Sequence, residues 1–323
     1  MASPRIPVLS VRGRPFERGQ QYGSQARRQI HKNVELYFDL WGSLWGAKRP
    51  EVLEWCAGLV PLIGEYDAEI LEELEGVAKG ADLSLEEVVA LNARYEMVFA
   101  QSLAPRGGAG CTSAAALPQA TKDGHTFIGQ NWDYKPRFQG LSLILEIEQE
   151  GRPNIVTHTE AGIIAHRGLN SAGVAVCLNA LVSNRDKFEL TTPFLIVARG
   201  ILNADSLSRA LKAVLNAKGA VSFDFLIAQR HGLESVVVMN PDGTMNENGT
   251  SELTTLNASP CAVTPFLMFS PMNPIRSSPT HAPGWSFFLE AVIEYDAHTL
   301  IISSSSMCMT PLVPPHFAVS STT

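Results

Sequence analysis

Cysteine is scarce in this chain of 323 residues, and none of its five cysteines belongs to a CxxC pair. An odd number of unpaired cysteines argues against a disulfide framework and against a zinc site built from cysteines. A chain of this length buries a large core without such staples. The N-terminal segment also lacks the uninterrupted apolar stretch of a secretory signal. These features predict a protein of the reducing cytoplasm.

Basic residues and long apolar runs are also few. The chain has 25 Lys and Arg against 32 Asp and Glu, a formal net charge of −7. A nucleic-acid footprint needs clustered Lys and Arg, so no nucleic-acid partner is expected. No run reaches the roughly 18 apolar residues of a membrane span, so no membrane partner is expected either. The 45% hydrophobic content is that of an ordinary globular protein.

The pattern of apolar residues divides the chain into a helical part and a part dominated by strands. Before residue 100, helical periodicity predicts three helices. The first spans 21–44, and the second ends at Gly80, which would be its C-terminal glycine. The third spans 85–98 and begins with a capping box formed by Ser84 and Glu87. After the glycine-rich 106–110, short strands are predicted over 111–118, 126–133, 141–148, 154–159, 163–167, 173–179, 223–229 and 235–239, and helices over 193–202 and 206–217. The turn signal Lys122-Asp123-Gly124 makes the first two strands a hairpin. Such blocks predict an α+β fold of stacked layers.

The last part of the chain has a different character. From Thr254 to Gly284 it is rich in Pro, Ser and Met and shows neither helical nor strand periodicity. A structureless stretch of this length is unusual inside a compact domain. Two explanations stay open, a frame-shifted or mis-spliced C-terminus and a diverged paralogue.

Cys111 is the residue whose context points to chemistry. An isolated cysteine is usually a small buried apolar group, but this one follows Gly110 and opens a predicted strand. That arrangement suits self-cleavage, in which the thiol attacks the Gly110 carbonyl and water releases the upstream chain. A glycine before the bond permits the strained backbone of the attack. The new α-amine of Cys111, with a reference pKa of about 7.7–8.0, would suit a general base.

Several motifs in order give the chain a family resemblance. They are GRPFERG at 13–19, LEELEGVAKGA at 71–81, LNARYE at 91–96, GCT at 110–112, GQNWD at 129–133, TEAGII at 159–164 and GLNSAGVAVCLNAL at 168–181. With these motifs the chain resembles the acyl-CoA:6-aminopenicillanic acid (isopenicillin N) acyltransferases, the C45 peptidase family of the N-terminal nucleophile hydrolase superfamily. The resemblance implies a four-layer αββα sandwich. It also implies a precursor cut at Gly110–Cys111 into a helical fragment, 1–110, and a nucleophile-bearing fragment, 111–323, that stay together as a heterodimer.

The resemblance also implies roles for single residues. Cys111 would be the processing and catalytic nucleophile, and Asp133 would orient its new α-amine. Asn179 would donate to the oxyanion, where loss of such a donor typically costs about 2.7–4 kcal/mol of barrier. Gln130 and Asn131 would line the substrate pocket. From the residues alone, Asn179 is equally well explained as a turn residue at a strand end. The alternative for Asp133, less favoured given the motif, is a strand-end aspartate that caps a turn.

The chain departs from the family pattern in its last third. The family's His-Thr-Asn-His stretch has SELTTLNAS at 251–259 in its place, which leaves Asn257 as the candidate for the second oxyanion donor. The family's Ser-Ile-Cys-Arg segment has no counterpart in this chain. The penicillin-forming members end in a peroxisomal tripeptide, whereas this chain ends Ser-Ser-Thr-Thr, so a cytoplasmic location is predicted.

The function implied is acyl transfer from acyl-CoA, as co-substrate, to an amine such as 6-aminopenicillanate, with isopenicillin N amidohydrolase activity as a companion reaction. No bound cofactor or metal is expected. Two alternatives remain: a related amidohydrolase that cleaves a linear amide, and a catalytically silent paralogue that keeps the fold.

Overall fold

The structure is a computed structural model, and it describes most of the chain up to residue 239 and three strands beyond it. The described residues are 6–99, 111–116, 118, 125–180, 186–217, 219, 221–230, 233–239, 266–269, 285–292 and 300–303. Of these, only the backbone is described at 98–99, 112, 114, 116, 133 and from 233 onward. None of the helices in these ranges is long and apolar enough to cross a membrane.

Six helices follow the first strand. They are α1 (Pro15–Gln25), α2 (Arg27–Trp45), α3 (Arg49–Tyr66), α4 (Ala68–Ala81), α5 (Leu85–Asn92) and α6 (Arg94–Phe99). The single helix predicted over 21–44 is two helices that meet at Ala26. The predicted capping box is confirmed: the Ser84 hydroxyl accepts from the Glu87 N–H at 3.2 Å, and the Glu87 carboxylate accepts from the Ser84 N–H at 2.9 Å.

The glycine predicted to end a helix has another role. Helix α4 continues through Gly80, and the left-handed residue after its end is Asp82, with φ 59°. A Cβ on Gly80 would lie 2.2 Å from the Gln20 carbonyl oxygen of α1, and one on Gly76 would lie 2.1 Å from that of Phe16. These glycines therefore let the backbones of α1 and α4 approach each other, and the prediction of a C-terminal glycine was wrong.

The larger sheet has seven strands in the order β1-β4-β5-β6-β7-β8-β9. They are β1 (Val8–Gly13), β4 (Ser142–Gln149), β5 (Ile155–Glu160), β6 (Arg167–Asn170), β7 (Val174–Ala180), β8 (Phe223–Gln229) and β9 (Leu233–Met239). Only β1, which the sequence analysis missed, pairs in parallel, with β4. All other pairs are antiparallel.

The strand predicted over 163–167 was wrong except at its last residue, where β6 begins. Residues 161–166 form a buried loop, and two of them are bound by side chains of the N-terminal helices. The Gly162 N–H donates to the Tyr22 hydroxyl at 2.8 Å, and the Asn92 amide binds Gly162 O at 2.9 Å and Ile164 N at 3.1 Å. Because burial makes this loop as apolar as a strand, periodicity could not separate the two.

The smaller sheet is antiparallel, in the order β10-β2-β3-β11-β12. Its strands are β2 (Cys111–Ala116), β3 (Phe127–Tyr134), β10 (Phe266–Phe269), β11 (Trp285–Val292) and β12 (Leu300–Ser303). The predicted hairpin of β2 and β3 is confirmed, with Cys111 opposite Trp132; its turn residues lie outside the described ranges. Strand β10 falls within 254–284, so the expectation that this stretch has no strand was wrong.

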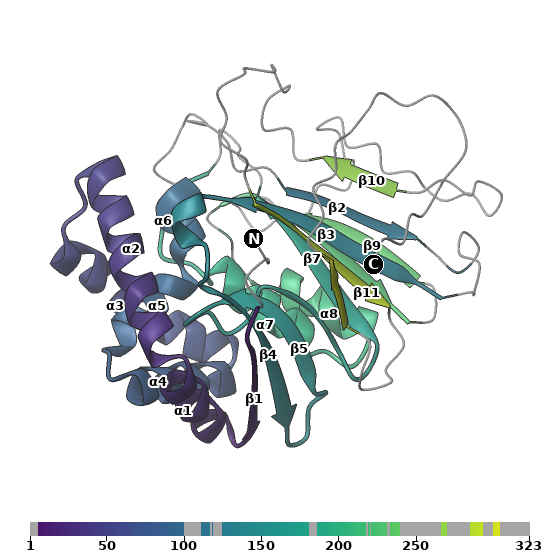
Figure 1. Cartoon of the computed structure of the whole chain (residues 1–323), viewed down its shortest axis with the longest axis horizontal. Helices are drawn as coiled ribbons and strands as arrows, with labels where there is room; N and C mark the ends of the chain where they lie inside the picture. Colours follow the sequence, from purple (N-terminus) through teal and green to yellow (C-terminus); the bar gives the residue numbers. More distant parts are fainter. Residues whose placement is uncertain are drawn as a thin grey trace, which may run out of the picture.

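The elements stack in layers (Figure 1). Helices α7 (Phe194–Leu202) and α8 (Leu207–Leu215) cover one face of the larger sheet, and the smaller sheet covers the other. A small apolar core lies between the two sheets, formed by Ala115, Ile128, Leu169, Ala175, Cys177, Leu226 and Ala228. The mixed α+β class is thus confirmed. Within the described ranges no helical layer covers the outer face of the smaller sheet, so the fourth layer stays a prediction.

Candidate functional site

Cys111 lies at the first position of β2, where the strand emerges from between the sheets. Ser113 and Ala115, at the alternate positions, are 1% and 6% exposed and face the larger sheet. Because side chains alternate along a strand, Cys111 shares this face, and it is half-buried. Its thiol is therefore directed toward the larger sheet.

Gln130 lies on the same face of the neighbouring strand. It is 1% exposed, and its amide donates to Leu178 O and accepts from Leu178 N–H at 3.3 Å, which fastens β3 to β7. The same oxygen accepts from Arg167 Nε at 3.1 Å. Asn131, the next residue, belongs to the opposite face of β3 and is half-buried. Of the two residues predicted to line the pocket, only Gln130 therefore shares the face of Cys111.

Arg167 is a functional candidate that the sequence analysis missed. It begins β6, is 1% exposed, and its guanidinium carbon lies 4.5 Å from the centroid of the Trp132 ring. It binds His158 Nδ1 at 2.6 Å and His166 Nδ1 at 2.8 Å. Arginine can only donate, so both imidazoles accept at Nδ1. Burial, helped by the charge of Arg167, lowers the pKa of both histidines well below the usual value, so both rings are neutral.

Asn179 lies at the centre of a second polar cluster between the sheets. Its amide Nδ2 donates to Ser113 Oγ at 2.7 Å and to Asp224 Oδ2 at 3.0 Å, so both N–H groups are used within the protein. Asp224 is the register partner of Asn179 on β8 and is 1% exposed. Burial raises the pKa of Asp224 to about 7, although the bond from Asn179 opposes the shift. Neither Asn179 Oδ1 nor Asp224 Oδ1 has a partner among the described residues.

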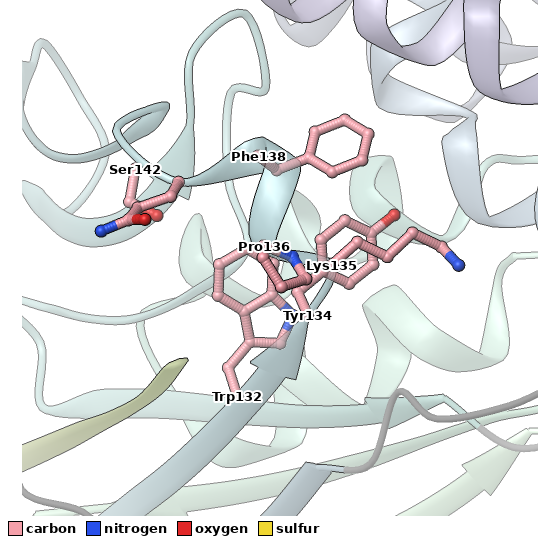
Figure 2. A pocket seen from close by; sticks show the side chains of 7 residues that line it. Trp132, Tyr134, Lys135, Pro136, Phe138 and Ser142 are labelled. Atoms are coloured by element: carbon pink, nitrogen blue, oxygen red, sulfur yellow. The ribbon is translucent and has the colours of Figure 1, made fainter. Parts of the chain in front are cut away.

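A small aromatic pocket opens beside the register partner of Cys111. Figure 2 shows the side chains that line it, among them Trp132, Tyr134, Lys135 and Phe138. The Trp132 and Tyr134 rings are stacked, with centroids 5.2 Å apart, and Phe138 lies 5.2 Å from Tyr134. The walls of the pocket include three aromatic rings, and Lys135 adds one ammonium group to them.

The remaining predicted residues are placed only in part. Asp133 follows Trp132 in β3, so its backbone lies one residue beyond the register partner of Cys111; its side chain is outside the description. Gly110 and Asn257 lie outside the described residues. The side chains that the structure describes include no group of three His, Cys, Asp or Glu arranged to hold a metal ion.

Comparisons with known proteins show what this chain is similar to. Residues 120–257 match the family model described as acyl-coenzyme A:6-aminopenicillanic acid acyl-transferase. A curated relative from Emericella nidulans, the acyl-coenzyme A:6-aminopenicillanic-acid-acyltransferase 40 kDa form, is 31% identical over 230 residues, 70% of this chain and 62% of that protein. An uncharacterized protein from Archaeoglobus fulgidus is 24% identical over 253 residues, 70% of this chain and 42% of that protein.

Fold and site together define an α+β protein in which a strand-opening cysteine faces buried polar clusters between two sheets. The matches then show what the chain is similar to: its residues 120–257 are similar to the acyl-coenzyme A:6-aminopenicillanic acid acyl-transferase family. The resemblance drawn from the motifs is confirmed. The chain spans 62% and 42% of the lengths of the two relatives.

Proposed function

We propose that the protein is a self-processing acyltransferase whose nucleophile, first for its own cleavage and then for acyl transfer, is Cys111. The observation that carries this proposal is the position of Cys111. It directly follows Gly110 in the chain, opens β2, and shares its face with the clusters around Gln130 and Asn179, in a relative of acyl-transferases.

Self-cleavage begins when the Cys111 thiol attacks the Gly110 carbonyl carbon. The C–N bond breaks as the acyl group moves to sulfur, and the thiol proton passes to the released amine. Water then hydrolyses the thioester, which leaves a carboxylate on Gly110 and restores the thiol. Cys111 now carries both a nucleophile and a free α-amine.

Buried ion pairs would hold the two fragments together after cleavage. Arg94 of the first fragment binds Glu160 of the second at 3.1 Å, and both side chains are at most 1% exposed. Glu73 of the first fragment binds Arg199 of the second at 2.7 Å. Removing one member of a buried pair leaves an uncompensated charge, so separation of the fragments is strongly disfavoured.

In acyl transfer the α-amine of Cys111 takes the thiol proton, and Asp133 orients that amine. Sulfur attacks the carbonyl of the acyl donor, the CoA thiol leaves with a proton, and an incoming amine resolves the acyl-enzyme. Asn179, with Asn257 as the second donor, stabilises the oxyanion. Its bond to Ser113 Oγ is the one that the oxyanion would replace, because Ser113 lies on the strand that carries the nucleophile.

The aromatic pocket beside Trp132 would take the acyl group, with Gln130 next to it on the same face of β3. Acyl-CoA is the donor and 6-aminopenicillanate the test acceptor, as the name of the Emericella nidulans relative suggests.

The test is a time course with phenylacetyl-CoA and 6-aminopenicillanate, in which amide product and released CoA thiol are measured separately. We expect the two to rise together in the wild-type protein and both to be lost in Cys111→Ala. Release of CoA without amide would favour the related amidohydrolase. No turnover by a correctly folded wild type would favour the silent paralogue.

A further inference from the structure

We propose that Arg167 is the cation that stabilises the Cys111 thiolate, and that its charge is kept unneutralised for this purpose. The inference rests on the proposed function, in which Cys111 is the nucleophile. It adds Arg167, at the start of β6, to the residues proposed to act with Cys111.

Geometry brings the two residues together across the space between the sheets. Cys111 is opposite Trp132 in register, and its side chain lies on the face that Gln130 and Trp132 share. The guanidinium of Arg167 contacts both of these residues, 4.5 Å from the Trp132 centroid and 3.1 Å from Gln130 Oε1. Arg167 therefore lies against the register partner of the nucleophile.

Arg167 differs from the other large buried arginines in the charge of its partners. Arg94 is paired with Glu160, and Arg18 and Arg199 share Glu73. Among the side chains that the structure describes, those that bind Arg167 are an amide and two imidazoles, none of which bears a negative charge.

A buried cation with neutral partners is costly, and such groups are concentrated at functional sites. Burial lowers the pKa of Arg167 to about 10, and the nearby Cys111 thiolate opposes that shift. The attraction is mutual, so the guanidinium favours the thiolate over the thiol. An opposite charge at close range typically moves a pKa by about 1–3.

The other titratable groups around Arg167 do not supply the missing negative charge near neutral pH. His158 and His166 are neutral, and burial raises the pKa values of Tyr95 and Cys177. Arg94, on α6, adds positive charge. The new α-amine of a cleaved Cys111 would add a group of its own, so cleaved and uncleaved protein are measured separately.

The experiment measures the pH dependence of Cys111 alkylation by iodoacetamide, followed by mass spectrometry of the peptide that contains Cys111. We expect R167M and R167Q to raise the apparent thiol pKa by about one or more, which is roughly tenfold slower alkylation at low pH. R167K, which keeps the charge, should restore most of the wild-type behaviour. H158Q, which replaces one neutral acceptor by another, is the matched control and should leave the thiol pKa unchanged.

The inference is overturned if folded R167M or R167Q alkylates with the wild-type pH profile, or if H158Q shifts that profile as much as they do. Should R167M not fold, R167Q against R167K decides in the same way. Alkylation reports the thiol whether or not the protein cleaves itself or transfers acyl groups. If R167M and R167Q raise the pKa of the Cys111 thiol as expected but the wild-type protein is inactive, the proposed function is refuted and this inference stands.

Discussion

The substitution Asp224→Asn tests how much the buried carboxyl of Asp224 contributes to stability at different pH values. Burial raises the pKa of the Asp224 carboxyl from its ordinary 3.8 to about 7 in the folded protein. From about pH 4 to about pH 7 the unfolded chain therefore releases a proton that the fold retains, and the contribution of Asp224 to stability falls across that window as pH rises. One pKa unit corresponds to about 1.4 kcal/mol, so the loss reaches on the order of 4 kcal/mol.

Asparagine removes this titration without changing the shape of the side chain. Its carbonyl oxygen can accept from Asn179 Nδ2 as Asp224 Oδ2 does, and its NH₂ can donate to Asn179 Oδ1, which lacks a partner among the described residues. We therefore expect D224N to be less stable than or equal to the parent near pH 4 and more stable by a few kcal/mol near pH 8.

The assay is chemical denaturation at several pH values, in a Cys111→Ala background so that one continuous chain unfolds. The quantity compared is the difference in free energy of unfolding between variant and parent. The contributions of other groups, such as the buried Glu96 with its pKa also raised to about 7, cancel in this difference. A difference that stays flat within about 0.5 kcal/mol from pH 4 to pH 8 would refute the reasoning, since it would mean that Asp224 titrates alike in both states.

Two further predictions concern the packing of the N-terminal helices. Glu73→Gln leaves the buried cations of Arg18 and Arg199 without their shared carboxylate and should cost about 3–5 kcal/mol in thermal or chemical unfolding; a loss below about 1 kcal/mol would contradict it. Gly80→Ala should cost about 1–3 kcal/mol despite the better helix propensity of alanine, because its Cβ would lie 2.2 Å from Gln20 O. Its matched control is Gly42→Ala, where the nearest atom is 3.6 Å away and unfolding should be unchanged or slightly harder; equal effects at the two positions would refute the packing argument.

Local sequence signals predicted most of the elements because those elements carry their own periodicity and caps. The Ser84–Glu87 capping box and the β2–β3 hairpin were found in this way, and β8 was predicted to the residue. Two of the failures share a cause. Gly80 and the loop at 161–166 owe their composition to a distant element packed against them, and no local pattern reports such contacts.

The candidate site divides along the same line. Cys111 was found because the chemistry needs the preceding glycine, which is a local signal. Gln130 shares the face of Cys111 because β2 pairs with β3, and Asn179 meets this face from β7 of the other sheet; the motifs implied both but could not demonstrate them. Arg167 and Asp224 were missed, since each matters only through residues that are distant in sequence and meet it between the sheets. The only available signals were the position of Asp224 within the largely apolar β8 and that of Arg167 at the start of β6.

The central claim is that Cys111 is a nucleophile that first cuts its own chain, and intact-mass measurement of the purified protein tests it most directly. We predict two species, with the masses of residues 1–110 and 111–323, and an N-terminal sequence of the larger one that begins Cys-Thr-Ser. Cys111→Ala should give a single species with the mass of the whole chain. A folded wild type that keeps the full-length mass, or a Cys111→Ala variant that is cut at the same bond, would contradict the account.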